Sequence, residues 1–158
     1  MKRLVICLCL VLGIGSPAYS ISDKQYGVPS TRLKHLSKKE LECLVNNAYH
    51  EAYGEGSIGM LLVTQVVFNR VKKSSKSACQ VIYANNQFSW TDKKHKKISK
   101  QTFKELEYLV LSLYYNSNKV PSKFRNAMYF HNTSVKPTWS RKFVKLGNHR
   151  NHVFYMEA

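Results

Sequence analysis

Three stretches of the chain repeat apolar residues at the spacing of an α-helix. The first covers residues 41–48 and follows Ser37-Lys38-Lys39-Glu40, in which the serine and the glutamate form a capping box. The second, residues 58–71, is apolar around most of its circumference, which predicts a buried central helix. The third opens at Ser99 or Thr102, and its apolar face consists of Phe103, Leu106, Leu109, Val110 and Leu113.

The pattern changes towards the end of the chain. Residues 127–131 and 153–156 are short runs rich in β-forming residues, and we expect them to pair as a small antiparallel ribbon. A short helix capped by Ser77 is predicted through residue 83. The fold class expected is therefore mainly α with a small antiparallel β element (α+β), in one domain that spans residues 37–158.

The first twenty residues do not follow these patterns. Lys2 and Arg3 precede an apolar run from Leu4 to Ile14, and small residues at Ala18 and Ser20 offer a cleavage site. This arrangement is typical of a secretory signal peptide, and it is too short to span a membrane permanently. We expect residues 1–20 to be removed, and residues 21–36 to form an extended lead-in to the domain. No further stretch predicts a transmembrane segment, so the mature chain should be exported to the periplasm or the extracellular cell wall.

The charge is strongly positive, with 25 basic and 9 acidic residues among 158 and a net charge of +16. Without residues 1–20 the net charge would be +14, because only Lys2 and Arg3 are lost. A charge of this size attracts polyanions. Outside the cytoplasm these are anionic envelope polymers and not nucleic acid, although the basic runs could equally be a solvated surface. We expect the protein to be a monomer.

Two cysteines remain after the signal peptide, Cys43 and Cys79. An oxidising compartment permits a disulfide between them. On a helical wheel Cys43 points away from the apolar stripe, where a free thiol would be exposed, and this favours pairing. Two independent thiols are the alternative.

Glu51 is the strongest candidate for chemistry. It lies in the last turn of the first helix, at the edge of the apolar stripe, and we expect that helix to end at Gly54. Burial and the negative end of the helix dipole both disfavour a charged carboxylate there, so the side chain should keep its proton near neutral pH. Such an acid can protonate a glycosidic oxygen. The alternative is an ion pair with a lysine or with Arg70.

Glu55 is the second carboxylate of this stretch. It could act as a base or nucleophile, in which case its separation from Glu51 would set the stereochemical outcome. It could also accept hydrogen bonds from backbone amides at the start of the next helix, which is the interpretation we favour.

Other functions remain open at this point. His50-Glu51 resembles the start of a zinc-protease motif, but Gly54 stands where the second ligand would be. A metal-dependent or amidase-type cell wall hydrolase could draw ligands from His131, His149 and His152. A non-catalytic, basic wall-binding module is a further alternative.

Several blocks together resemble the bacterial cell wall hydrolases of the spore-cortex-lytic type. These blocks are Glu51-Ala52-Tyr53-Gly54-Glu55, Val66-Val67-Phe68-Asn69-Arg70-Val71, Gln87-Phe88-Ser89-Trp90, Ala127-Met128-Tyr129-Phe130-His131-Asn132, Pro137-Thr138-Trp139 and His152-Val153-Phe154-Tyr155. The resemblance runs from about Leu41 to Tyr155. Tyr53 stands where the family usually has arginine, so a substrate contact from that arginine is not expected here.

The resemblance implies a lysozyme-like or lytic-transglycosylase-like fold that acts on peptidoglycan glycan strands. Such enzymes use one glutamate, which here is Glu51, as acid and then base at the bond between N-acetylmuramic acid and N-acetylglucosamine. They need no metal and no cofactor. Phe88 and Phe130 are assigned to the core. The candidate substrate-binding residues are Gln87, Ser89, Trp90, Tyr129, His131, Asn132, Trp139, His152 and Tyr155, although core packing is an alternative for each aromatic.

Overall fold

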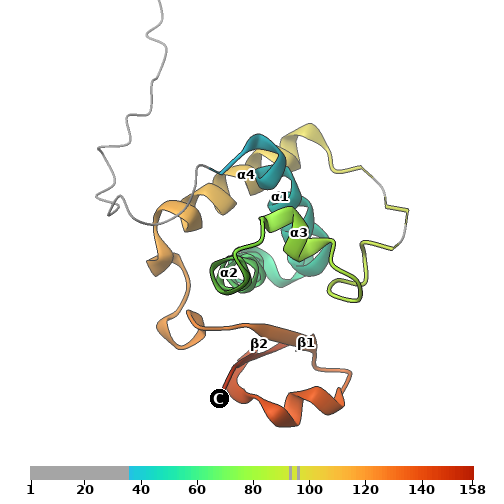
Figure 1. Ribbon diagram of the computed structural model, residues 1–158. Coiled ribbons are helices and arrows are strands. Elements are labelled where there is room, and N and C mark those ends of the chain that lie inside the picture. Colours follow the sequence, from blue (N-terminus) through green and yellow to red (C-terminus); the bar gives the residue numbers. More distant parts are fainter. Residues whose placement is uncertain (1–35, 93, 96) are drawn as a thin grey trace, which may run out of the picture.

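The computed structural model describes residues 36–92, 94, 95 and 97–158 (Figure 1). The predicted signal peptide and nearly all of the predicted lead-in lie outside these residues. Within the described ranges, no helix combines the length and the apolar character needed to cross a membrane.

Four α-helices form the body of the molecule: α1 (Lys38–Ala52), α2 (Gly56–Ser74), α3 (Ala78–Ile82) and α4 (Lys100–Tyr115). Serines predicted from the sequence cap α1, α3 and α4, because the side chains of Ser37, Ser77 and Ser99 each accept a hydrogen bond from a backbone amide of the first turn. Each cap satisfies a backbone donor that would otherwise lack a partner. Short 3₁₀ turns, η3 (Ser117–Lys119) and η4 (Ser122–Phe124), follow α4.

Helix α2 is the central element, as its apolar sequence predicted. All of its residues from Gly59 to Val67 are buried. Figure 1 shows α2 almost end-on, with α1, α3 and α4 on one side and the sheet on the other. The helix is longer than expected and continues through Lys72 and Lys73, where cations are favourable at the carboxyl end of a helix.

The junction between α1 and α2 differs from the prediction. Helix α1 ends at Ala52, and residues Tyr53–Glu55 form the 3₁₀ turn η2. The left-handed conformation belongs to Gly56, with φ of 71°, and not to Gly54. Gly56 is the residue that separates the two helices, because it adopts at low cost a backbone conformation that other residues avoid.

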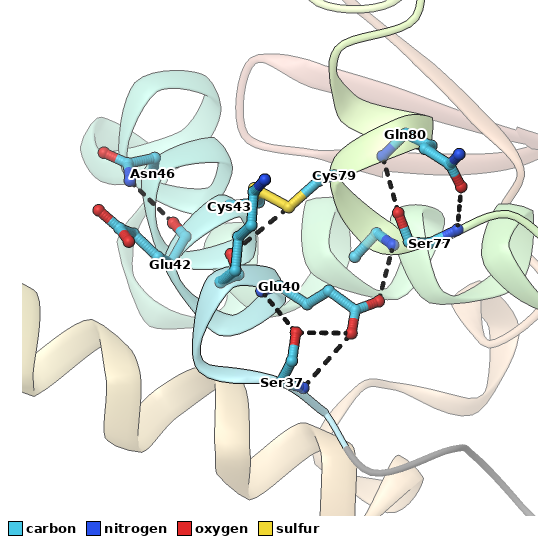
Figure 2. The surroundings of a disulfide bond; sticks show 10 residues. Ser37, Glu40, Glu42, Cys43, Asn46, Ser77, Cys79 and Gln80 are labelled. Carbon is cyan, nitrogen blue, oxygen red and sulfur yellow. Dashed lines mark hydrogen bonds between the residues drawn. A yellow bond between two sulfur atoms is a disulfide. The ribbon is translucent and has the colours of Figure 1, made fainter.

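The structure contains the disulfide between Cys43 and Cys79, and it joins α1 to α3 (Figure 2). Contrary to the helical-wheel prediction, Cys43 lies in the core and is 8% exposed. Glu40 strengthens the same junction: its carboxylate accepts hydrogen bonds from the backbone amides of Ser37 and Ala78 at 3.3 Å each. Helices α1 and α3 are therefore linked in two ways, by the disulfide and by the hydrogen bond from the Ala78 amide to Glu40.

The β element is a three-stranded antiparallel sheet in the order β1-β3-β2. The strands are β1 (Tyr129–Asn132), β2 (Val144–His149) and β3 (His152–Met156). The sequence predicted β1 and β3 and missed β2. Strand β2 is harder to recognise because its pairing with β3 is interrupted by a bulge between Lys145 and Gly147.

The two faces of the sheet have different surroundings. Tyr129 pairs with Tyr155, and Phe130 pairs with Phe154, so alternation places the tyrosines on one face and the phenylalanines on the other. Phe154 is fully buried, and Phe130 packs against the helical core. The tyrosine face is covered by the 3₁₀ segment η5 (Thr138–Lys142), the orange-red turn below the sheet in Figure 1.

Removal of the disulfide should lower the stability of the fold. The bridge closes a loop with a sequence separation of 36, and a crosslink of this length restricts the unfolded chain by about 3–4 kcal/mol. The Cys43→Ala/Cys79→Ala variant should lose about that much free energy of unfolding in a denaturant titration. Reductant should lower the midpoint of the wild type and leave that of the variant unchanged. Equal midpoints for the wild type and the variant would contradict this role.

Candidate active site

Glu51 lies in the last turn of α1, and its side chain is mostly withdrawn from solvent. Burial raises the pKa of the Glu51 carboxyl to about 7, while the positive charge of Arg70 acts in the opposite direction. In the described part of the chain, no cation lies within 4.0 Å of this carboxyl and no group donates a hydrogen bond to it. The ion pair considered as an alternative for Glu51 is therefore absent from these residues, and the carboxyl can hold a proton at neutral pH.

Arg70 comes from the carboxyl-terminal half of α2 and connects the helices to the sheet. Its Nε donates to the carbonyl of Met128 at 2.7 Å, and its Nη1 donates to Oε1 of Gln87 at 3.0 Å. The guanidinium carbon lies 5.3 Å from the ring centroid of Tyr129 and 5.6 Å from that of Phe88. These contacts hold the charge of Arg70 close enough to Glu51 to influence its proton, but outside ion-pair distance.

Trp90 and His50 flank the end of α1. The indole Nε1 of Trp90 donates to Oδ1 of Asn47 at 3.0 Å. The rings of His50 and Trp90 are stacked, with centroids 4.6 Å apart and planes 24° apart. Burial, and then His95, lowers the pKa of His50, so this ring stays neutral at neutral pH. Trp90 is thus fixed beside the turn of α1 that carries Glu51.

Asn47 is a site residue that the sequence analysis did not single out. It is 1% exposed, and its Nδ2 has no hydrogen-bond partner among the described residues. It stands one turn before Glu51 on the same helix face. The sequence did contain a signal for it: Asn47 is a polar residue next to the apolar stripe of the helix, at a position where a buried helix usually has an apolar side chain.

Glu55 is buried and accepts hydrogen bonds, but its partners differ from those expected. It is 8% exposed, and its two carboxylate oxygens accept hydrogen bonds from Asn151, one from the backbone amide at 3.1 Å and one from Nδ2 at 3.2 Å. The amides at the start of α2 are therefore the wrong partners. Gly59 makes room for this arrangement, since a Cβ there would lie 2.3 Å from the Cβ of Glu55.

The turn between β2 and β3 is anchored to η2 by further contacts. His149 Nε2 donates to the carbonyl of Glu55 at 3.3 Å, and Arg150 Nη1 donates to the carbonyl of Gly54 at 3.1 Å. The 3₁₀ turn η2, which follows Glu51, is therefore attached to the sheet through the side chain of Glu55 and through the backbone carbonyls of Gly54 and Glu55.

Four of the predicted substrate-binding residues gather on the tyrosine face of the sheet. His131 Nε2 lies 2.9 Å from the Tyr155 hydroxyl, and Trp139 contacts both rings edge-on. Tyr155 is only 7% exposed. Tyr129 belongs to the same cluster through Trp139, and it is the member that also contacts Arg70. Tyr129 therefore links this cluster to the neighbourhood of Glu51.

The remaining predicted residues are placed differently. Gln87 and Ser89 are exposed in the loop before Trp90, and Gln87 binds Arg70. Asn132 is exposed and accepts a hydrogen bond from the amide of Ser134 at 2.9 Å, so it shapes the turn after β1. His152 does not fit the surface contact expected of it. It is 6% exposed and packs against Phe130, and burial lowers its pKa.

No group of three or more His, Cys, Asp and Glu side chains within residues 36–92, 94, 95 and 97–158 is arranged to hold a metal ion. The Glu51 carboxyl is the group in this neighbourhood whose pKa permits proton transfer at neutral pH, and the charge of Arg70 acts on it.

The raised pKa predicts that Glu51→Gln stabilises the protein at alkaline pH. The folded pKa, about 7, exceeds the ordinary value of 4.5, so the folded state binds more protons and loses stability as pH rises between those values. The loss should reach about 3 kcal/mol above pH 7. Denaturant titrations should show equal stability of wild type and Glu51→Gln near pH 4, and higher stability of the variant at pH 8. A variant that is less stable than wild type at pH 8 would mean that the carboxylate is well solvated or paired.

Comparisons with known proteins bear on both the fold and the family. The catalytic domain of the germination-specific lytic transglycosylase SleB from Bacillus anthracis is 22% identical, with a TM-score of 0.60 over 81% of this chain and 99% of that one. The catalytic domain of the Bacillus cereus SleB protein is 19% identical, with a TM-score of 0.60 over 82% of this chain and 98% of that one. These similarities establish the shared fold. No curated protein matches the chain.

The sequence profile of the Cell Wall Hydrolase family matches residues 54–155. This range includes α2, the loop with Trp90 and all of the sheet except Met156, the last residue of β3, and it begins just after Glu51. The assignment of Glu51 therefore depends on its surroundings in the structure and on the resemblance noted above. Because the match covers well over half of the 158 residues, the chain belongs to the cell wall hydrolase family.

Proposed function

We propose that this protein cleaves the glycan strands of peptidoglycan, with Glu51 as its single acid and base. The observation that carries the proposal is a largely buried carboxyl whose pKa is about 7, with no ion-pair partner in the described part of the chain. Membership of the cell wall hydrolase family supports it, as does the fold shared with a lytic transglycosylase. Glycosidic bonds break readily only when the leaving oxygen is protonated, and a carboxyl with this pKa can supply that proton at neutral pH.

The proposed reaction has two proton transfers. Glu51 first donates its proton to the oxygen between N-acetylmuramic acid and N-acetylglucosamine, and the bond to the muramoyl C1 breaks. The Glu51 carboxylate then removes the proton of the C6 hydroxyl of the same muramoyl sugar, whose oxygen bonds to C1 and closes a 1,6-anhydro ring. Glu51 is protonated again at the end. Attack by water in place of the C6 hydroxyl would give hydrolysis of the muramidase type.

The residues around Glu51 have supporting roles in this proposal. Arg70 holds the carboxyl in a range where it can both give and take a proton, because its charge opposes the effect of burial. Trp90, fixed by Asn47 and His50, offers a ring beside the acid on which a sugar can stack. Gln87 and Ser89 are exposed in the same loop, and in this proposal they bind the polar groups of the sugars.

Export belongs to the same proposal. Residues 1–20 have the pattern of a signal peptide, and the substrate of a cell wall hydrolase lies outside the cytoplasm. The positive net charge would hold the exported protein near anionic envelope polymers.

Glu51→Gln should abolish the release of soluble muropeptides from purified sacculi, because glutamine keeps the shape of the side chain and has no proton to donate. The expected loss in rate is about a hundredfold to ten-thousandfold. Glu105→Gln is the matched control, since it makes the same change at an exposed position on α4 and should keep full activity.

Glu55→Gln should retain more activity than Glu51→Gln, because the Glu55 carboxylate binds Asn151. The reverse order of activities would mean that Glu55, and not Glu51, is the catalytic acid.

Mass spectrometry of the products assigns the reaction: anhydromuramoyl ends indicate transglycosylation and reducing ends indicate hydrolysis. Free stem peptides, or activity lost to a chelator, would contradict the proposal.

The pH profile should report the pKa of Glu51. Only the protonated carboxyl can start the reaction, so kcat/KM should fall above about pH 7 and lose about tenfold from its plateau by pH 8. Replacing Arg70 by methionine removes the charge that lowers the pKa of Glu51, so the alkaline limb should move to higher pH. A profile that stays flat to pH 9 in the wild type would rule out Glu51 as the proton donor.

A further inference from the structure

A pocket of about 400 Å³ lies next to Arg70 and extends beyond the residues described so far. Its walls come from the carboxyl-terminal end of α2, from α3, from the loop that carries Gln87, and from the start of β1. Arg70 and Tyr129 belong both to this pocket and to the surroundings of Glu51. The pocket therefore adjoins the candidate acid through these two side chains.

The pocket is positively charged. Arg70, Lys73 and Lys76 line it, together with the amides Gln80 and Gln87. Arg70 is bound to the backbone and to Gln87, so its charge has a fixed position. The lysines are exposed at the rim, where they can reach an incoming anion.

One carboxylate of the protein already lies in this pocket. Glu157 forms an ion pair with Lys73, and its other oxygen accepts a hydrogen bond from the Tyr129 hydroxyl at 3.0 Å. The arrangement indicates what the pocket can bind: a carboxylate held between an ammonium group and a phenol. The side chain of Glu157 is 36% exposed and that of Lys73 is 59% exposed, so an external carboxylate can compete for these partners.

We propose that this pocket binds the carboxylates of the stem peptide that peptidoglycan carries on its muramoyl sugars. The inference depends on the proposed function, because it extends the substrate from the glycan strand to the peptide attached to it. The sugars of the strand are neutral, and the free carboxylates belong to the peptide. The cationic pocket shares Arg70 with the surroundings of Glu51, and its two amides suit a peptide backbone.

Binding measurements in the Glu51→Gln variant test the pocket without turnover. The probes, titrated by calorimetry, are a soluble disaccharide–tetrapeptide from peptidoglycan and the same disaccharide with its lactyl carboxyl capped as a methylamide in place of the peptide, so that the second probe carries no carboxylate. The peptide-bearing probe should bind more tightly. Adding Lys73→Ala and Lys76→Ala should weaken that probe about tenfold, at about threefold for each exposed ion pair, and should leave the disaccharide unchanged.

Glu157 provides a change in the opposite direction. Glu157→Gln removes the internal competitor and frees Lys73, so the peptide-bearing probe should bind about threefold more tightly. Matched controls on α4 carry the same changes in net charge at exposed positions: Lys100→Ala/Lys104→Ala for the lysine pair and Glu105→Gln for the glutamate. Both controls should leave the affinity for either probe within twofold.

Two outcomes overturn the inference. One is equal affinity for the two probes, and the other is an effect of the α4 controls as large as that of the pocket variants, which would mean general attraction to a basic surface. Failure of the proposed function looks different, because wild-type protein would then release no muropeptides from sacculi whatever the pocket variants bind. If binding depends on the pocket while cleavage is absent, the chain recognises stem peptides without cutting glycan.

Discussion

The position of the Arg70 guanidinium is the constraint on which the candidate site depends. A buried carboxyl without a nearby cation would hold its proton too firmly to act later as a base, and a direct ion pair would remove the proton altogether. Arg70 lies between these extremes, since its charge lowers the pKa of Glu51 from a distance beyond an ion pair. It remains there because Met128 and Gln87 bind its nitrogens. The bonds that join α2 to the sheet thus also hold the charge that moderates the effect of burial on the pKa of Glu51.

Features that follow from local chemistry could be predicted from the sequence. The capping boxes at Ser37 and Ser77 and the buried α2 are set by side chains within a few residues of one another. The setting of Glu51 was predictable for the same reason, because a helix wheel locates it at the edge of an apolar stripe. The identity of the family followed from the order of several motifs and not from any one of them.

Features that depend on tertiary contacts could not be predicted in this way. The carboxylate of Glu55 binds an amide 96 residues away, and nothing near it in the sequence indicates that partner. Strand β2 was missed because its bulge interrupts the alternation that identifies strands. The glycine between α1 and α2 was placed two residues early, since helix α1 first tightens into a 3₁₀ turn.

The geometry of the sheet explains why some candidate substrate-binding residues are buried in the core and others lie on the opposite face. Motifs quoted in sequence order place Tyr129, Phe130 and His131 together, but neighbouring residues of a strand face opposite sides. Phe130 turns to the helical core, whereas Tyr129 and His131 turn to the face covered by η5. His152, opposite Asn132 in the register, is buried against Phe130. A motif in a strand therefore combines residues that pack into the helical core with residues that pack against η5.

The attachment of η2 to the turn between β2 and β3 has a consequence for biosynthesis. Asn151, whose amide binds Glu55, is translated 96 residues later. The turn after α1 therefore lacks this hydrogen bond while the ribosome is still making the intervening chain. Helix α1 can form early, yet the acid gains its final setting only once the hairpin has emerged and folded back. A nascent or prematurely terminated chain would carry Glu51 without the contacts that hold the following turn against the sheet.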